Sequence, residues 1–276
     1  MCHAGAMITD TRTPTALVTG ASAGLGSEFA RQLARRGNHM VLVARNRERL
    51  DALAAELGGA EVIIADLTTP AGIESVVDRV RDPLDPVDTV VNNAGFALHD
   101  PFLRSQEQEE DANIDIMVRA VTRICHAAAP GMVDRGHGLI LNVSSVSALL
   151  SSGTYSAAKA FVLTLTESLS ADLTGTGVHA SVVLPGFTRT EFHQRAHLDM
   201  SSLPDWMWLD SGEVARIALD DAENGTVISV PGVQYKAITT LLRLLPRSVV
   251  RQISSGAHRP SWNSGTRRFG LFRSTV

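Results

Sequence analysis

Short apolar runs alternate with longer stretches of helical periodicity along most of the chain. The apolar runs predict buried strands at 16–19, 39–44, 62–65, 87–91, 139–143, 178–184 and 226–230. Apolar positions three and four residues apart predict helices at 27–36, 46–57, 70–81, 107–130, 154–173 and 211–222. This alternation predicts an α/β fold in which one parallel, doubly wound sheet carries helices on both faces.

A glycine-rich loop lies between the first expected strand and the first expected helix. Gly20, Gly24 and Gly26 allow the backbone to approach a ligand closely, and the same loop contains Ser22 and Leu25. The start of the helix offers free N–H groups to a pyrophosphate. Strand, loop and helix together therefore predict a Rossmann-type dinucleotide site.

The end of the second expected strand bears on the choice of cofactor. In dinucleotide-binding folds an acid at this place holds the ribose 2′-OH, whereas an arginine accommodates a 2′-phosphate. Here the strand ends in Ala44 and Arg45 follows, which favours NADP(H) over NAD(H). The alternative is a surface arginine that only opens the next helix.

Two later turns also lie at the carboxyl ends of strands. Asp66 and Leu67 follow the third strand and are expected beside the adenine. Asn93, Ala94 and Gly95 follow the fourth strand, where small residues allow a cofactor to approach; an ordinary turn is the alternative. Since ligands of doubly wound sheets bind at the carboxyl ends of strands, these turns are expected to meet at one site.

The most informative stretch for chemistry follows the fifth expected strand. Tyr155 and Lys159 are four residues apart on an expected helix, so that both can reach one ligand. A nearby ammonium is expected to lower the tyrosine pKa, which would make Tyr155 an acid or base near neutral pH. A hydroxyl of Ser145, or of Ser144, would hold the substrate oxygen. The plain alternative is a tyrosine and a lysine on a solvated helix face.

Composition limits the class of protein. The chain has 276 residues, 44% of them hydrophobic and 20% charged, which suits a soluble globular protein with a sizeable core. Only two cysteines are present, the first residues lack the pattern of a signal peptide, and no apolar run reaches the length of a membrane span. A cytoplasmic protein is therefore expected, with a flexible lead at 1–13 and no metal site.

The carboxyl-terminal part differs from the rest in charge. No acidic residue follows Glu223, whereas eight Lys and Arg residues do, so this part carries a charge of about +8. Because the net charge is −4, the chain up to Glu223 carries about −12. The segment 234–256 is expected to be an amphipathic basic helical segment interrupted at Pro246. It could contact a membrane surface, cover the substrate pocket, pack on a partner subunit or be a partly solvated appendage. The tail 257–276 is expected to be disordered, and no motif for nucleic acid accompanies it.

The sequence contains four motifs that occur in one protein family in the same order and with similar spacing. They are Thr19–Gly26 (TGxxxGxG), Asn92–Gly95 (NNAG), Ser145 with Tyr155 and Lys159 (a serine and YxxxK), and Pro185–Gly186 with Thr190 (PGxxxT). The sequence thus resembles the short-chain dehydrogenase/reductase family from about Thr15 to Val230, within an expected NAD(P)-binding domain at 14–233. The resemblance implies an oxidoreductase acting on an alcohol or carbonyl, often as a homo-oligomer.

The resemblance also implies roles for individual residues. The tyrosine would be the acid or base, the lysine would bind the nicotinamide ribose, and the serine would hold the carbonyl oxygen. The segment after the sixth strand would bind the nicotinamide carboxamide through Pro185, Gly186, Thr188 and Thr190. Two departures stand out: the serine is unusually near the tyrosine, and Met117 occupies a position where the family often has an Asn of the proton relay.

The loops expected around this site carry many apolar residues. They are Phe96, Leu98, Leu149, Leu150, Phe187, Phe192, Trp206, Met207 and Trp208. They favour an NADP(H)-dependent oxidoreductase for a small hydrophobic carbonyl or alcohol, such as an acyl, isoprenoid or steroid-like compound. Packing of a surface helix is the alternative for the two tryptophans. The alternative function is a catalytically weak, cofactor-binding regulatory or scaffold protein, which Met117 would favour.

Overall fold

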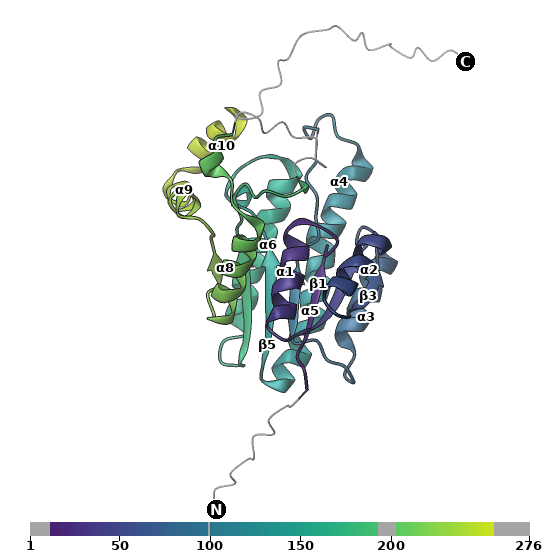
Figure 1. The fold of residues 1–276 in the computed structure, drawn as a ribbon. Coiled ribbons are helices and arrows are strands. Elements are labelled where there is room, and N and C mark those ends of the chain that lie inside the picture. The colour runs from purple at the N-terminus through teal and green to yellow at the C-terminus, as the bar shows by residue number, and fades with distance from the viewer. Residues whose placement is uncertain (1–11, 99, 193–202, 257–276) are drawn as a thin grey trace, which may run out of the picture.

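The chain folds around one seven-stranded parallel sheet (Figure 1). The computed structural model describes residues 12–98, 100–192 and 203–256. The expected tail at 257–276, and the expected lead except residues 12 and 13, lie outside these ranges. The strand order is β3-β2-β1-β4-β5-β6-β7. The strands are β1 Thr15–Thr19, β2 His39–Ala44, β3 Glu61–Ile64, β4 Thr89–Asn92, β5 Gly138–Val143, β6 Val178–Val183 and β7 Ile228–Ser229.

Helices cover both faces of the sheet, as the alternating pattern predicted. One face is covered by α1 Gly24–Arg35, α2 Arg47–Glu56 and α8 Ser211–Glu223. The other is covered by α3 Pro70–Arg81, α5 Ala120–Arg135 and α6 Gly153–Asp172. The sheet order reverses between β1 and β4, and ligands of such sheets bind at this reversal, beside the carboxyl ends of the strands.

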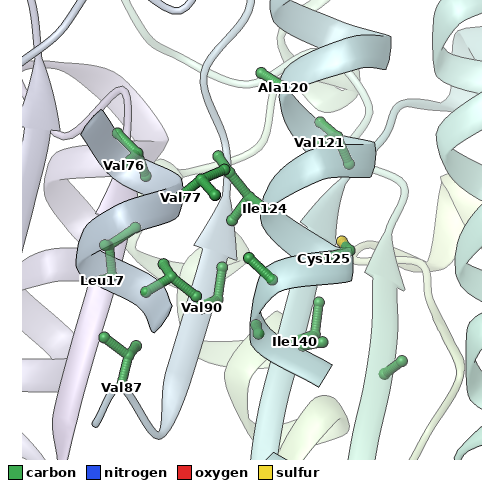
Figure 2. Close-up of a cluster of buried hydrophobic side chains, with 14 of the residues drawn as sticks. Leu17, Val76, Val77, Val87, Val90, Ala120, Val121, Ile124, Cys125 and Ile140 are labelled. Atoms are coloured by element: carbon green, nitrogen blue, oxygen red, sulfur yellow. The ribbon is translucent and has the colours of Figure 1, made fainter. Parts of the chain in front are cut away.

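Two apolar cores result from this layering. Successive residues of a strand point to opposite faces, so Leu17 joins one core while Ala16 and Val18 join the other. Figure 2 shows part of the first core, where Val77 of α3 and Ile124 of α5 meet between the two helices. The strands are therefore apolar on both faces, which explains why they read as continuous apolar runs.

The expected helix at 107–130 is not one continuous α-helix. The chain forms α4 Glu107–Ile114, a π-helical turn Asp115–Arg119 and then α5, which continues to Arg135 with Pro130 inside it. In the π turn the N–H of Ala120 donates to the carbonyl of Asp115, five residues earlier. Such a turn inserts an extra residue and shifts the side chains that follow, and π turns are frequent at functional sites.

Two helices follow the last strand, α9 Val233–Leu244 and α10 Arg247–Gly256. They lie beyond α8 at the upper end of Figure 1, the end at which α4 lies. Pro246 stands between them, where the sequence predicted the interruption. Within the described ranges, no helix is both long and apolar enough to cross a membrane.

Candidate active site

The glycine loop is packed so closely that side chains would not fit. A methyl group on Gly26 would lie 2.2 Å from the carbonyl oxygen of Gly20, and Gly20 has a positive φ of 68°. A methyl group on Gly20 would lie 2.8 Å from Nδ2 of Asn93. The loop therefore needs glycine at both places for the backbone to turn at the end of β1.

Helix α1 begins at this loop with its first turn uncapped. Its N-cap is Ala23, which offers no side-chain acceptor to the first N–H groups. Ser22 and Leu25 are partly exposed beside it. Free N–H groups at a helix start attract anions. A methyl group on Gly24 would lie 3.2 Å from Cβ of Thr190, so the PGxxxT segment lies next to the glycine loop.

Thr19 fastens the glycine loop to the turn after β4. Its hydroxyl accepts hydrogen bonds from the N–H groups of Asn93 at 3.0 Å and Ala94 at 3.1 Å. The Asn93 amide donates in return to the carbonyl of Thr19 at 2.9 Å. These bonds join neighbouring strands at the reversal of the sheet, where the two motifs were expected to meet.

The three residues expected at the adenosine end follow β2 and β3, at one edge of the sheet. Arg45 leaves β2 with its side chain 73% exposed, and its guanidinium lies 3.8 Å from the carboxylate of Asp66. Asp66 accepts from the N–H of Thr68 at 3.0 Å and from its hydroxyl at 2.8 Å. Burial raises the pKa of Asp66, but the hydrogen bonds from Thr68 and the nearby charge of Arg45 lower it. Together they hold the pKa of Asp66 below its usual value. Leu67 is buried in the core.

These residues fit a nicotinamide dinucleotide. The glycine loop forms a cradle that methyl groups would fill, and the uncapped start of α1 supplies N–H donors for a pyrophosphate. Arg45 is exposed at the strand end where such folds discriminate a 2′-phosphate.

The two serines after β5 have different surroundings. Ser144 is buried, and its hydroxyl donates to the backbone carbonyl of Lys159 at 2.7 Å. Ser145 is partly exposed, and its hydroxyl accepts from the N–H of Ser147 at 3.1 Å and can reach the phenol of Tyr155. Ser144 therefore holds β5 to helix α6, and Ser145 is the serine beside the tyrosine. A short 3-10 turn, Val146–Leu149, lets this short connection reach α6.

Tyr155 and Lys159 lie on α6 on the same side of the helix. The Lys159 ammonium is 5.7 Å from the centre of the Tyr155 ring and donates to the carbonyl of Val143 at 2.8 Å. Lys159 is 6% exposed, and burial lowers its pKa to about 8. The pair is thus not on a solvated helix face.

The expected lowering of the Tyr155 pKa is wrong for this state of the protein. Burial raises the pKa of the phenol to about 12, and the hydroxyl of Ser145 acts in the opposite direction but more weakly. The sequence argument counted the ammonium and left out desolvation, which disfavours the phenolate.

Met117, at the position where the resemblance implied a relay Asn, lies beside Lys159. A methyl group on Gly95 would lie 3.1 Å from the sulfur of Met117 and 3.8 Å from Nζ of Lys159, so the three residues adjoin. Met117 is 1% exposed and belongs to the π turn. Asn113, one turn earlier, donates instead to the carbonyl of Phe96 at 2.8 Å. It therefore anchors the loop after Gly95.

Aromatic residues of the expected substrate loops form two ring contacts, one of them with Tyr155. The ring of Phe192 lies 6.0 Å from that of Tyr155, and the rings of Phe187 and Trp208 are 6.1 Å apart. Trp206 is 64% exposed. Of the two tryptophans, Trp208 therefore packs within the loop.

Pro185, Gly186 and Thr188 follow β6 next to these rings. The carbonyl of Pro185 accepts from the N–H of Val146 at 3.1 Å, which joins this segment to the connection after Ser145. Thr188 is buried, and its hydroxyl donates to the carbonyl of Gly186 at 3.0 Å. All the expected site segments thus meet at the carboxyl end of the sheet.

The sequence patterns missed one residue at this end. Tyr235 of α9 is 1% exposed and contacts the segment after β6, although no motif includes it. The available signal was composition, because the chain has only two tyrosines and both are at this site.

A doubly wound parallel sheet with a glycine loop, NNAG turn and YxxxK helix defines a dinucleotide-binding oxidoreductase. Residues 14–201 match the family described as short chain dehydrogenase. The chain belongs to this family of oxidoreductases.

Solved structures and relatives agree with the assignment. A short-chain dehydrogenase from Sphingobium yanoikuyae in complex with NADPH is 35% identical, with a TM-score of 0.77 over 92% of this chain and 100% of that one. A bulky-bulky ketone specific alcohol dehydrogenase from Comamonas testosteroni is 30% identical, with a TM-score of 0.73 over 86% of this chain and 97% of that one. The 3-oxoacyl-[acyl-carrier-protein] reductase FabG of Escherichia coli is 33% identical over 64% of this chain and 74% of its own length.

Proposed function

We propose that this protein is an NADP(H)-dependent oxidoreductase that interconverts a carbonyl and an alcohol on a hydrophobic substrate. The observation that carries the proposal is the grouping of Ser145, Tyr155 and Lys159 beside the aromatic ring of Phe192. Polar groups suited to a reacting oxygen thus adjoin an apolar surface suited to the rest of the substrate.

Each of the three polar residues has a distinct task in this proposal. Tyr155 donates its proton to the carbonyl oxygen in reduction, or accepts one from the alcohol in oxidation. Ser145 donates a hydrogen bond to the same oxygen, and Lys159 holds the nicotinamide ribose. When bound, the dinucleotide would supply or accept the hydride. A bound substrate would exclude water from the site, which would strengthen these polar contacts.

The preference for NADP(H) is supported by two features of the adenosine end. Ala44 offers no carboxylate for a ribose 2′-OH, and the exposed Arg45 is available to a 2′-phosphate. The Sphingobium relative was solved with NADPH. A charge-assisted contact of this kind contributes about 1.5–3 kcal/mol.

Titrating NADPH and NADH against wild type and Arg45→Ala tests this preference. The ratio of the two affinities should shrink about 10–100-fold in the variant. An unchanged ratio would mean that another residue binds the 2′-phosphate.

A bulky, lipophilic substrate is supported by the rings of Phe187, Phe192 and Trp208. The Comamonas enzyme is described as specific for bulky-bulky ketones, and the Escherichia coli relative reduces 3-oxoacyl groups by its name. We expect apolar ketones and acyl compounds to be accepted before small polar sugars or hydroxy acids.

The deciding experiment is an activity screen of wild type and Tyr155→Phe with NADPH across apolar ketones, aldehydes and acyl substrates. Turnover in the wild type should fall by at least about 100-fold in Tyr155→Phe. NADPH binding, followed by its fluorescence, should be the same in both proteins because the phenol oxygen is not needed for it. Cofactor binding without turnover in the wild type would favour the scaffold alternative.

Two further associations are proposed. We expect a homo-oligomer, which light scattering after gel filtration can measure. We also propose a peripheral contact of α9 and α10 with anionic membrane surfaces. It is supported by exposed basic residues and exposed apolar side chains on the same two helices: Lys236, Arg243, Arg247, Arg251, Val233, Leu241, Leu244 and Ile253.

A further inference from the structure

Tyr235, on the first turn of α9, is pressed against the segment that follows β6. A methyl group on Gly186 would lie 2.1 Å from Cζ of the tyrosine ring and 2.2 Å from Cε2. Gly186 has no positive φ, so its backbone alone does not require glycine there. The tyrosine ring is therefore what limits this position to glycine.

The hydroxyl of Tyr235 connects the two ends of the next loop. It accepts from the N–H of Phe187 at 3.0 Å and donates to the carbonyl of Met207 at 2.6 Å. Burial raises the pKa of this phenol, so it keeps the proton that it donates. Nearby, the N–H of Leu209 donates to the carbonyl of Phe187 at 2.8 Å, so the loop is closed at its base.

The residues that Tyr235 fixes are those proposed to contact cofactor and substrate. Gly186 and Phe187 begin the segment that contains Thr190, whose side chain adjoins Gly24 of the glycine loop. The same segment carries Phe192, whose ring contacts Tyr155. A displacement at the base of the loop would therefore move both the nicotinamide side and the substrate side of the site.

The second carboxyl-terminal helix contacts another loop of the site. The hydroxyl of Ser254 on α10 accepts from the N–H of Ser151 at 3.0 Å and donates to the carbonyl of Val250 at 2.9 Å. Ser151 lies on the connection between Ser145 and Tyr155. Helices α9 and α10 thus contact both active-site loops, outside the motifs from which the site was inferred.

We propose that Tyr235 is a positioning residue: it sets the segment 186–192 against the cofactor and against Tyr155, from a helix outside the recognised motifs. This inference rests on the proposed function for its catalytic consequence, but its structural content can be measured without turnover.

The first test compares Tyr235→Phe with Thr239→Val. Thr239 lies one turn later on α9, is also buried, and donates only within its helix, to the carbonyls of Tyr235 and Lys236. Tyr235→Phe keeps the ring and leaves the N–H of Phe187 and the carbonyl of Met207 without this partner. We expect it to raise the KM for substrate and the Kd for NADPH by at least about 5-fold, because two hydrogen bonds are lost. The kcat should change less than either constant.

Tryptic cleavage after Arg189, an exposed residue of the same segment, gives a readout that needs no activity. Tyr235→Phe should accelerate it several-fold and Thr239→Val should not. Equal KM, Kd and cleavage rates in Tyr235→Phe and wild type would overturn the inference. Failure of the proposed function is a different result, because then wild type itself would neither bind NADPH nor reduce carbonyls.

The second test uses the contact between the ring and Gly186. Gly186→Ala should weaken NADPH binding strongly, because its methyl group overlaps the tyrosine ring. Combining it with Tyr235→Ala removes the overlap, so the double variant should lose less affinity than the two single losses together predict. Additive losses would mean that the ring does not limit this position, and they would overturn the proposal.

Discussion

The buried ammonium of Lys159 should make the stability of the protein depend on pH. Its pKa of about 8 lies below the ordinary 10.5 because the ammonium is desolvated. Between these two values the unfolded chain holds a proton that the folded protein has released, so the free energy of unfolding rises with pH. Below about 8 both states are protonated, and the folded protein bears the full cost of the buried charge.

The variant Lys159→Met has no titrating group at this position, so comparing it with wild type isolates the contribution of Lys159. We expect the stability of wild type relative to Lys159→Met to rise by a few kcal/mol between about pH 7.5 and pH 10.5, at about 1.4 kcal/mol per unit of pKa shift. Urea unfolding at a series of pH values measures the difference, in which other titrating groups cancel. A difference that is constant or falls with pH would mean that the lysine pKa is not lowered.

Met117 occupies the position where the resemblance implied a relay Asn, and its surroundings suit a thioether. It is buried against Gly95 and close to the ammonium of Lys159. Met117→Asn should cost about 1–3 kcal/mol, because the amide is a buried polar group without an evident partner. We expect no gain in turnover. Met117→Leu is the matched control and should cost less than about 1.5 kcal/mol. A well-folded, faster Met117→Asn enzyme would mean that a relay water or backbone partner is in place.

At the scale of elements, two glycines of helices α1 and α5 should respond in opposite ways to the same substitution. Gly26→Ala would drive a methyl group into the carbonyl of Gly20, so NADPH binding should be lost together with several kcal/mol of stability. Gly131 lies inside α5, where a methyl group meets only the flexible end of Arg135 at 3.2 Å. Gly131→Ala should stabilise by about 0.4–1 kcal/mol through helix propensity and leave cofactor binding unchanged. Thermal unfolding and NADPH titration distinguish the two, and equal effects would contradict a close-packed cofactor loop.

Most elements could be predicted because their apolar patterns are local. The helix at Pro70–Arg81 has the expected bounds, since Thr69 caps it by accepting from the N–H of Gly72 and a proline stands at its first turn. The π turn at Asp115–Arg119 could not be predicted, because one inserted residue hardly changes the apolar periodicity. Strand direction and the order of motifs placed Tyr155 and the glycine loop together. The contact of Tyr235 with Gly186 joins segments 49 positions apart by packing alone, and no pattern within either segment encodes it.

The choice between Ser144 and Ser145 shows the same limit at finer detail. Both follow β5, and the sequence favoured Ser145 and left Ser144 as the alternative. Only the helix that returns over the strand separates them, because the carbonyl of Lys159 takes the hydroxyl of Ser144. Desolvation of Tyr155 was missed for the same reason, since burial depends on elements that pack from elsewhere in the chain.

At the scale of the whole molecule, charge is divided between the two ends of the chain. The chain up to Glu223 carries about −12, and the eight basic residues after it are unbalanced by any acid. In the described part of that segment, Arg243, Arg247 and Arg251 are exposed on helices that also expose Leu244 at 78%. A negative body would be repelled by an anionic surface while these helices are attracted, so the proposed contact would orient the molecule with its active-site end toward the membrane.

Sedimentation of the full chain with vesicles tests whether α9 and α10 bind an anionic membrane surface. We expect binding to phosphatidylserine-containing vesicles at low salt, little binding to phosphatidylcholine vesicles, and loss of binding as salt screens the charges. Replacing Arg243, Arg247 and Arg251 with Gln should weaken binding about 100-fold, at about 1 kcal/mol for each basic residue near the surface. The control replaces Arg35, Arg81 and Arg216, exposed arginines of α1, α3 and α8, and removes the same charge elsewhere. If both triple variants lose binding equally, only net charge matters and the proposed surface is wrong. If neither vesicle type binds wild type and Leu244→Ser changes its oligomeric state in light scattering, this face belongs to a subunit interface instead.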